Sequence, residues 1–283
     1  MRERERNELA TDGVTLIRGF FTGDEIGSLR VAVDALLASD VPRSRQVLYT
    51  HEPTPPGRPH FDALMYQWLN PHLLPDRGST RALVLATRAR VREILGAEPV
   101  LFQDLLLLKR AGHPRFPWHQ DFPFWPVDRP IGVIVWTPLI AADEHTGGLA
   151  FARASHRLAG YPPANTDPGR GAGGTELWPA VDLHTGRLQG DEQIAPDRAL
   201  TTCDIVRPRF QAGDAAVFDP LLFHMSPAKS AGPTRAAWSS IWLHPSVRWH
   251  HGRAPRHPLC RRVPDGAPVT EEAVRGTGGR QLP

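Results

Sequence analysis

The stretch from Phe116 to Phe122, which reads Phe-Pro-Trp-His-Gln-Asp-Phe, constrains the fold more than any other part of the chain. In an extended strand, alternate side chains point to the same face. His119 and Asp121 therefore share one face of such a strand, and Gln120 points to the other. An imidazole and a carboxylate side by side provide two of the three ligands of a metal site, so the fold must bring in a third from elsewhere.

His224 is the best candidate for the third ligand, and it lies far from His119 in the sequence. Two imidazoles and one carboxylate on a triangular face leave open coordination positions on Fe(II) for a substrate and for oxygen. Taken alone, a His-x-Asp triplet is more often a pair of packed or solvated residues. The chain has 13 histidines, and short motifs recur by chance. The rest of the sequence must therefore support a fold in which these residues meet.

The order of the predicted elements provides that support. Helices are predicted over residues 22–39, where Thr22 and Glu25 form a capping box, and over residues 80–95, which Gly96 is placed to end. A short strand is expected near residues 13–19. Short runs of β-forming residues then occur at residues 100–109, 131–139, 148–152, 205–211, 215–219 and 236–244. This pattern predicts a mainly β fold with flanking helices, a double-stranded β-helix or cupin-like jelly roll, in which distant strands converge at one mouth.

We expect a single domain over residues 1–244, with its jelly-roll core at residues 99–244. Residues 40–78 read as a long loop with a short helical piece near residues 61–65. Residues 160–200 read as an insertion that covers the mouth like a lid. Residues 245–283 are rich in Arg, Pro and Gly, and read as a basic tail that is only partly ordered.

Composition narrows the class of protein. No apolar run is long enough to span a membrane, and the start of the chain lacks the apolar core of a signal peptide, so we expect a cytoplasmic protein without membrane association. The net charge of +3 is small, which argues against nucleic acid as the main partner. Cys203 and Cys260 are expected to be free thiols. Lysine occurs only at Lys109 and Lys229, which we attribute to codon bias toward arginine in a GC-rich genome.

An arginine beyond His224 has the position that a dicarboxylate co-substrate requires. Arg235 opens the last predicted strand, eleven positions after His224. A dicarboxylate that chelates iron through one end needs a cation for the other end, and a guanidinium can hold a carboxylate with two parallel hydrogen bonds. We predict this role for Arg235, with the hydroxyl of Ser226 as an additional donor.

Together these features resemble the phytanoyl-CoA dioxygenase family of Fe(II)- and 2-oxoglutarate-dependent oxygenases. The resemblance runs from about Gly13 to about His244 and rests on Trp118-His119-Gln120-Asp121, Trp136, Gly147-Gly148-Leu149 leading to Ser155-His156, Gly213-Asp214, His224-Met225-Ser226 and Arg235. The chain departs from the family in two places. Ala152 to His156 replaces the usual Pro-Gly-Ser-His turn, and Met225 and Ala228 stand where the family often has Gly and Asn.

The resemblance implies a role for each of these residues. His119, Asp121 and His224 would bind iron, and Arg235 and Ser226 would hold the distal carboxylate of 2-oxoglutarate. The co-substrate pocket would be lined by Trp136 and by Gln103 and Leu105 of the strand at residues 100–109. Candidate substrate residues are Phe122, Trp118, His60 and Trp178. Because related halogenases have a small residue in place of the carboxylate, the presence of Asp121 implies that the chain is not a halogenase.

The expected function is a dioxygenase that uses Fe(II), 2-oxoglutarate and O2 to hydroxylate or desaturate an unactivated C–H bond of a small organic molecule, in bacterial secondary metabolism. An acyl-CoA or carrier-linked acyl substrate is the alternative within the family, although the sequence has no dedicated phosphate-binding motif. Two rivals come from other classes: a cupin-like sugar isomerase or zinc enzyme, which would not need Arg235, and a metal-free binding barrel.

Overall fold

The computed structural model describes residues 2–38, 66–73, 78–113, 115–158, 200–254 and 257–275. Its strands are β1 (Val14–Ile17), β2 (Tyr66–Leu69), β3 (Val100–Lys109), β4 (Phe116–His119), β5 (Gly132–Pro138), β6 (Ala150–Ala152), β7 (Ile205–Val206), β8 (Ala215–Phe218), β9 (His224–Ser226) and β10 (Arg235–Leu243). Its α-helices are α1 (Glu3–Asp12), α2 (Gly23–Ala38), α3 (Gly78–Leu95) and α5 (Glu271–Arg275), and its short 3-10 helices are η3 (Pro71–Leu73), η4 (Phe122–Phe124), η5 (Ser155–Arg157), η7 (Leu200–Thr202) and η8 (Pro258–Arg261).

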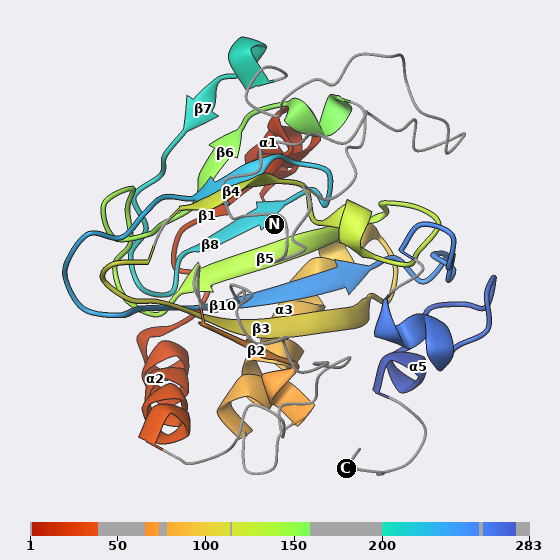
Figure 1. Cartoon of the computed structure of the whole chain (residues 1–283), viewed down its shortest axis with the longest axis horizontal. Coiled ribbons are helices and arrows are strands. Elements are labelled where there is room, and N and C mark those ends of the chain that lie inside the picture. Colours follow the sequence, from red (N-terminus) through yellow and green to blue (C-terminus); the bar gives the residue numbers. More distant parts are fainter. Residues whose placement is uncertain are drawn as a thin grey trace, which may run out of the picture.

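The strands form two sheets (Figure 1). The larger has the order β1-β8-β5-β10-β3-β2, and the smaller has the order β4-β9-β6-β7. The pairings within both sheets are antiparallel, and neighbours in a sheet are often far apart in the sequence. The prediction of a mainly β fold with flanking helices is confirmed.

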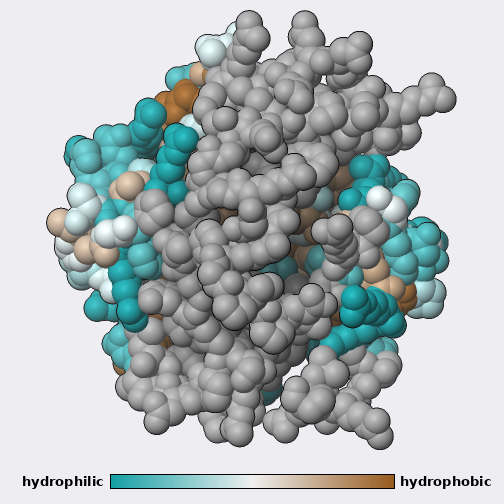
Figure 2. Space-filling model, viewed as in Figure 1, coloured by the Kyte–Doolittle hydropathy of each residue, from teal (hydrophilic) through white to brown (hydrophobic). Residues whose placement is uncertain are grey.

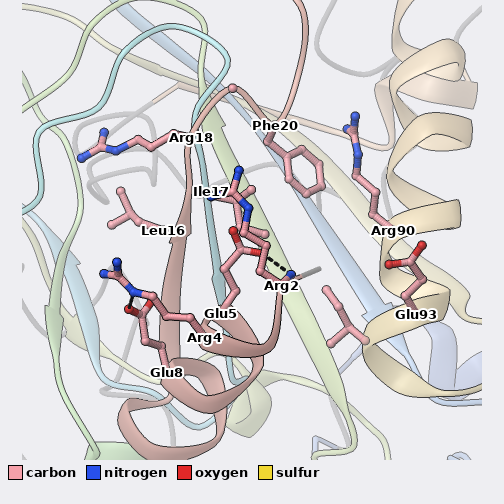
Figure 3. Close-up of a pocket in the computed structure, with 12 residues that line it drawn as sticks. Arg2, Arg4, Glu5, Glu8, Leu16, Ile17, Arg18, Phe20, Arg90 and Glu93 are labelled. Atoms are coloured by element: carbon pink, nitrogen blue, oxygen red, sulfur yellow. Dashed lines mark hydrogen bonds and ion pairs between the residues drawn. The ribbon is translucent and has the colours of Figure 1, made fainter.

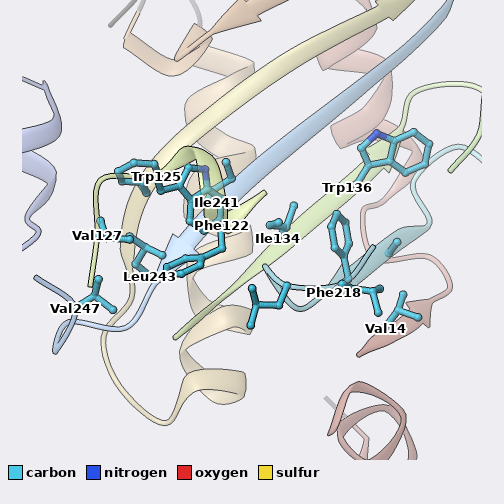
Figure 4. Packing of buried hydrophobic residues seen from close by; sticks show 14 of the residues in the cluster. Val14, Phe122, Trp125, Val127, Ile134, Trp136, Phe218, Ile241, Leu243 and Val247 are labelled. Carbon is cyan, nitrogen blue, oxygen red and sulfur yellow. The ribbon is translucent and has the colours of Figure 1, made fainter. Parts of the chain in front are cut away.

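One hydrophobic core lies on the inner face of the larger sheet (Figure 4). Ile134 and Trp136 of β5 point into it, as do Phe218 of β8 and Ile241 of β10, which sit on alternate positions of their strands. Phe151 of β6 brings the smaller sheet onto the same core. Any functional side chain on these strands therefore lies next to apolar residues that hold the two sheets together.

A second core fills the space between the other face of the larger sheet and the helices. Leu106 and Leu108 of β3 point into this core, whereas Leu105 and Leu107 pack against the first one. The predicted capping box opens α2, because Thr22 Oγ1 accepts from the Glu25 amide at 3.2 Å and Glu25 Oε2 accepts from the Thr22 amide at 2.7 Å. Gly96, with a φ of +66°, ends α3 as predicted.

Two elements contradict the predicted loop at residues 40–78. Strand β2 pairs with β3, and η3 follows it. A buried carboxylate anchors this segment, because Asp104 accepts from His72 at 2.5 Å and from Trp238 Nε1 at 3.0 Å. The backbone amide of Asn70 also donates to the carbonyl of Asp104 at 2.7 Å. A strand of four residues is too short for its pattern to stand out in the sequence.

The segment after residue 244 is not the partly ordered tail that we expected. Val247, Trp249, Leu259 and Val263 are buried in the same core as β5 and β10, together with Val269 and Val274. Helix α5 contacts β3, and Glu271 of α5 pairs with Arg88 of α3. The apolar residues that do this are separated by Arg, Pro and Gly without a helical or strand period, so periodicity could not reveal them.

The exposed side chains of the described residues are largely polar. In the view of Figure 2, hydrophilic residues predominate at both margins of the described surface. The large hydrophobic residues that are exposed among the described residues are Val31, Leu85 and Ile131. None of the described helices is both long and apolar enough to cross a membrane.

The packing of Trp249 predicts a measurable contribution of the C-terminal segment to stability. Trp249 is 1% exposed, so Trp249→Ala is expected to lower the free energy of unfolding by about 3–5 kcal/mol, because it leaves a cavity in the core. Arg261→Ala, on the exposed side of η8, is the control and should change it by less than about 0.5 kcal/mol. Urea unfolding measures both. Equal, small effects would mean that the segment does not belong to the folded core.

Candidate functional site

Two short strands of the smaller sheet bring the predicted metal ligands together. β4 pairs with β9 so that His119 lies opposite His224, and Phe116 lies opposite Ser226, with an irregularity in register between the two pairs. The imidazole rings of His119 and His224 are 4.1 Å apart between centroids. Asp121 lies two residues beyond the end of β4, in a helical backbone conformation before η4, and its carboxylate faces the His119 ring.

The three side chains form a compact cluster. His119 Nε2 lies 3.3 Å from Asp121 Oδ1, and His224 Nε2 lies 3.8 Å from the same oxygen. The ligand atoms of all three residues lie within 4.8 Å of one another. His224 is buried, and His119 and Asp121 are partly exposed. Two imidazole nitrogens and one carboxylate oxygen are a donor set that suits Fe(II).

The surroundings of His224 fix which nitrogen faces the cluster. His224 Nδ1 lies 3.0 Å from the carbonyl oxygen of Leu222, which places the Nδ1 proton there and leaves Nε2 as a lone-pair donor. Burial, and then the neighbouring His119, lower the pKa of His224 to about 4. Burial alone would raise the pKa of Asp121, but the neighbouring His224 and His119 hold it below its ordinary value. At neutral pH the pair is a neutral imidazole beside a carboxylate, both in the state that binds a metal ion.

The turn from Asp219 to Leu222 supports the cluster from behind. The amides of Asp121 and Phe122 both donate to the carbonyl of Pro220 at 3.1 Å, which ties the end of β4 to this turn. Within the turn, Asp219 Oδ1 accepts from the amide of Leu221 at 2.7 Å. Burial raises the pKa of Asp219 to about 6.

The predicted co-substrate residues also meet. Arg235 is 1% exposed, and its guanidinium lies 5.6 Å from the centre of the Trp136 ring and 3.5 Å from Ser226 Oγ. It donates to the carbonyl of Gly147 at 3.0 Å and to that of Leu107 at 3.2 Å. Ser226 lies two residues after His224 on β9, so both side chains share one face.

Sequence reasoning missed one residue of this group. Lys109, at the end of β3, is fully buried, and its Nζ donates to the carbonyl and to the hydroxyl of Ser226, both at 3.0 Å. Lys109 lies directly opposite Arg235 in the pairing of β3 with β10. Burial, and then the charge of Arg235, lower the pKa of Lys109 to about 7. The chain has two lysines, Lys109 and Lys229, and both are buried, which is rare for this residue type. Their burial follows from the fold, so nothing in the sequence alone indicated it.

The remaining predicted residues are placed as follows. Gln103 and Leu105 lie on β3 at alternate positions that lead to Lys109, and Leu105 packs against the inner core. Phe122 is buried in that core, with the guanidinium of Arg253 5.3 Å from its ring centre. Trp118 packs against Ala152, Leu200 and Phe223 on the side of β4 away from His119, which does not fit a wall beside the metal ligands. His60 and Trp178 lie outside the described residues.

A large open cavity lies elsewhere, between α1, β1 and α3 (Figure 3). It contains none of the residues discussed above. Its charged side chains are largely engaged with neighbours, since Arg4 pairs with Glu8, and Arg18 pairs with Asp214. It is therefore a groove among surface ion pairs rather than a competing candidate for the chemical site.

The chain matches known proteins in sequence. A family model described as phytanoyl-CoA dioxygenase (PhyH) matches residues 9–237. The ectoine dioxygenase of Halomonas elongata is 29% identical over 144 residues, and the match covers 49% of this chain. It spans 41% of the length of that relative.

Solved structures match over nearly the whole chain. The non-heme alpha-ketoglutarate-dependent carbocyclase SnoK from nogalamycin biosynthesis superimposes with a TM-score of 0.69 at 15% identity, covering 96% of this chain and 95% of SnoK. The epimerase SnoN, in complex with Fe3+, alpha-ketoglutarate and nogalamycin RO, gives a TM-score of 0.66 at 19% identity, covering 95% of each chain. At these identities the likeness concerns the fold, and it confirms the predicted jelly roll.

The buried carboxyl of Asp219 predicts a dependence of stability on pH. Its pKa in the folded state, about 6, lies above that of a free Asp, so the stability it contributes is present below pH 4 and is lost as the pH rises through 6. Asp219→Asn keeps an acceptor for Leu221 and removes this loss. The free energy of unfolding of Asp219→Asn should exceed that of the wild type by about 2–3 kcal/mol at pH 7.5 and by less than about 1 kcal/mol at pH 4.5. Denaturant unfolding at both pH values measures this, and Asp34→Asn, at an exposed position of α2, should show no such trend.

Proposed function

The chain belongs to the phytanoyl-CoA dioxygenase family, and from that premise we propose that it is an Fe(II)- and 2-oxoglutarate-dependent dioxygenase that oxidises a small organic substrate. The single observation that carries the proposal is the meeting, on one face of β9, of the His119, Asp121 and His224 cluster with the buried pair Lys109 and Arg235. The first group suits Fe(II), and the second suits the far end of a dicarboxylate.

His119, Asp121 and His224 would hold the iron through Nε2, a carboxylate oxygen and Nε2. Bound iron, together with 2-oxoglutarate, would supply the activation of O2 that the protein's own side chains cannot provide. The protein's part is to keep three ligands on one side, so that the remaining positions stay open. The rings of Phe218 and Phe151 pack around His224, at 4.8 and 6.4 Å, and keep water from its buried side.

Lys109, Arg235 and Ser226 would hold the distal carboxylate of 2-oxoglutarate. Ser226 lies two strand residues, or about 7 Å, from His224. This distance is comparable to the length of a five-carbon dicarboxylate whose other end chelates the metal. Lys109 donates two of its three protons to Ser226, and the described part of the chain shows no acceptor for the third. Trp136 Nε1 is buried without a hydrogen-bond partner among the described residues, so it offers a further donor beside Arg235.

The reaction would be hydroxylation or desaturation of an unactivated C–H bond. Asp121 would supply a carboxylate ligand at the position where related halogenases have a small residue, which argues against halogenation. The name of ectoine dioxygenase and the complex of SnoN with nogalamycin RO support a small organic substrate. SnoK and SnoN come from nogalamycin biosynthesis, which supports a role in secondary metabolism.

An anaerobic titration of the metal-free protein with Fe(II) and then 2-oxoglutarate tests this function. The wild type should develop a visible charge-transfer band that requires both additions. His119→Ala should lose the band, because a ligand is missing, and Arg235→Ala should require at least tenfold more 2-oxoglutarate, because a charge-assisted bidentate contact is lost. His145→Ala, a histidine with 82% of its side chain exposed, is the matched control and should titrate like the wild type. A well-folded wild type that gives no band would refute the proposal.

The lowered pKa of Lys109 predicts that 2-oxoglutarate affinity depends on pH. Lys109 carries its charge below about pH 7 and loses it as the pH rises further, so the dissociation constant should increase by up to tenfold per pH unit between pH 7 and pH 9. Lys109→Met should bind 2-oxoglutarate more weakly at pH 6.5 and show little of this dependence. The same anaerobic titration at several pH values measures both. A wild-type dissociation constant that stays level from pH 6.5 to 9 would contradict the prediction that titration of Lys109 in this range is coupled to 2-oxoglutarate binding.

A further inference from the structure

Gln120, the residue between the two ligands His119 and Asp121, is buried just beyond the end of β4. It is 3% exposed, and its Nε2 donates to the carbonyl oxygen of Leu221 at 2.7 Å. Leu221 is itself buried. A buried carbonyl needs a hydrogen-bond partner, and a side chain of this length and donor type supplies it here.

The turn that Gln120 reaches leads directly to the third ligand. The amide of Leu222 donates to the carbonyl of Asp219 at 2.9 Å and closes the turn. The carbonyl of Leu222 lies 3.0 Å from His224 Nδ1 and so sets the orientation of that ring. Any displacement of this turn therefore moves His224 relative to the other two ligands.

We infer that Gln120 is a positioning residue that fixes the distance between the His119 and Asp121 segment and His224. Strand pairing alone does not fix it, since β4 ends at His119 and its register with β9 is irregular. Beyond the strand, two amides share the single carbonyl of Pro220. The bond from Gln120 to Leu221 adds an independent second attachment, so the two halves of the metal site keep one spacing. This role rests on the proposed function, because it assumes that the cluster binds a metal ion.

Cobalt(II) binding to the metal-free protein tests the inference without any catalytic turnover. Gln120→Met keeps the length of the side chain and removes its donor. It should weaken Co(II) binding about tenfold or more and change the shape of the visible d–d bands, which report coordination geometry. Ser240→Ala is the matched control: Ser240 is buried on β10 and accepts from Trp242 Nε1 at 2.8 Å, so this variant also loses one buried hydrogen bond, away from the ligands. It should bind Co(II) like the wild type.

Thermal unfolding of the metal-free variants separates positioning from general stability. Both variants should lose similar stability, and only Gln120→Met should lose Co(II) affinity. Wild-type Co(II) affinity and bands in Gln120→Met would overturn the inference and leave the proposed function intact. Failure of the wild type to bind Co(II) would overturn both. Gln120→Asn, whose amide is one methylene too short to reach Leu221, is the second variant, and it should lose affinity in the same direction.

Discussion

The pairing of β4 with β9 is the interaction on which the site depends. It places His119 and His224 opposite each other across neighbouring strands, although more than a hundred residues separate them in the sequence. β4 has four residues and β9 has three, so the pair could not persist alone. It is held because β6 continues the smaller sheet and packs Phe151 onto the core of the larger one. The ligand geometry is thus a product of the closed double sheet rather than of any local motif.

The two faces of β3 bury opposite charges in different ways. On the helix side, Asp104 accepts hydrogen bonds from His72 and Trp238, so that carboxylate is satisfied within the fold. On the inner side, Lys109 meets only the oxygens of Ser226 among the described residues, and the charge of Arg235 opposes its own. Burying two cations together is unfavourable unless an anion joins them. Asp104 therefore stabilises the fold. A bound dicarboxylate would supply the negative charge that favours the burial of Lys109 and Arg235.

The elements with strong local sequence signals could be predicted from the sequence. The capping box of α2, the end of α3 at Gly96 and the long apolar strand β3 follow from propensity and periodicity. His224 was found because the chemistry of a three-ligand site demands a distant partner for His119. Strand β2 and helix α1 were missed. β2 is too short to display a period, and α1 is almost entirely polar, with no buried residue. Lys109 and the packed C-terminal segment were missed because their burial depends on tertiary neighbours that no local pattern encodes.

The arrangement of charge also distinguishes the classes of enzyme that could use such a cluster. A zinc hydrolase or a cupin-like isomerase needs a metal ion and a substrate, and gains nothing from two cations buried behind the third ligand, since they would disfavour the metal by repulsion. A metal-free binding barrel has no use for an imidazole whose Nδ1 is fixed by Leu222 so that Nε2 faces Asp121. A dicarboxylate that chelates the metal through one end and meets Lys109 and Arg235 through the other screens that repulsion and explains both features at once. In the proposed function the cations and the ligands would therefore form one site, whose charges the co-substrate would balance.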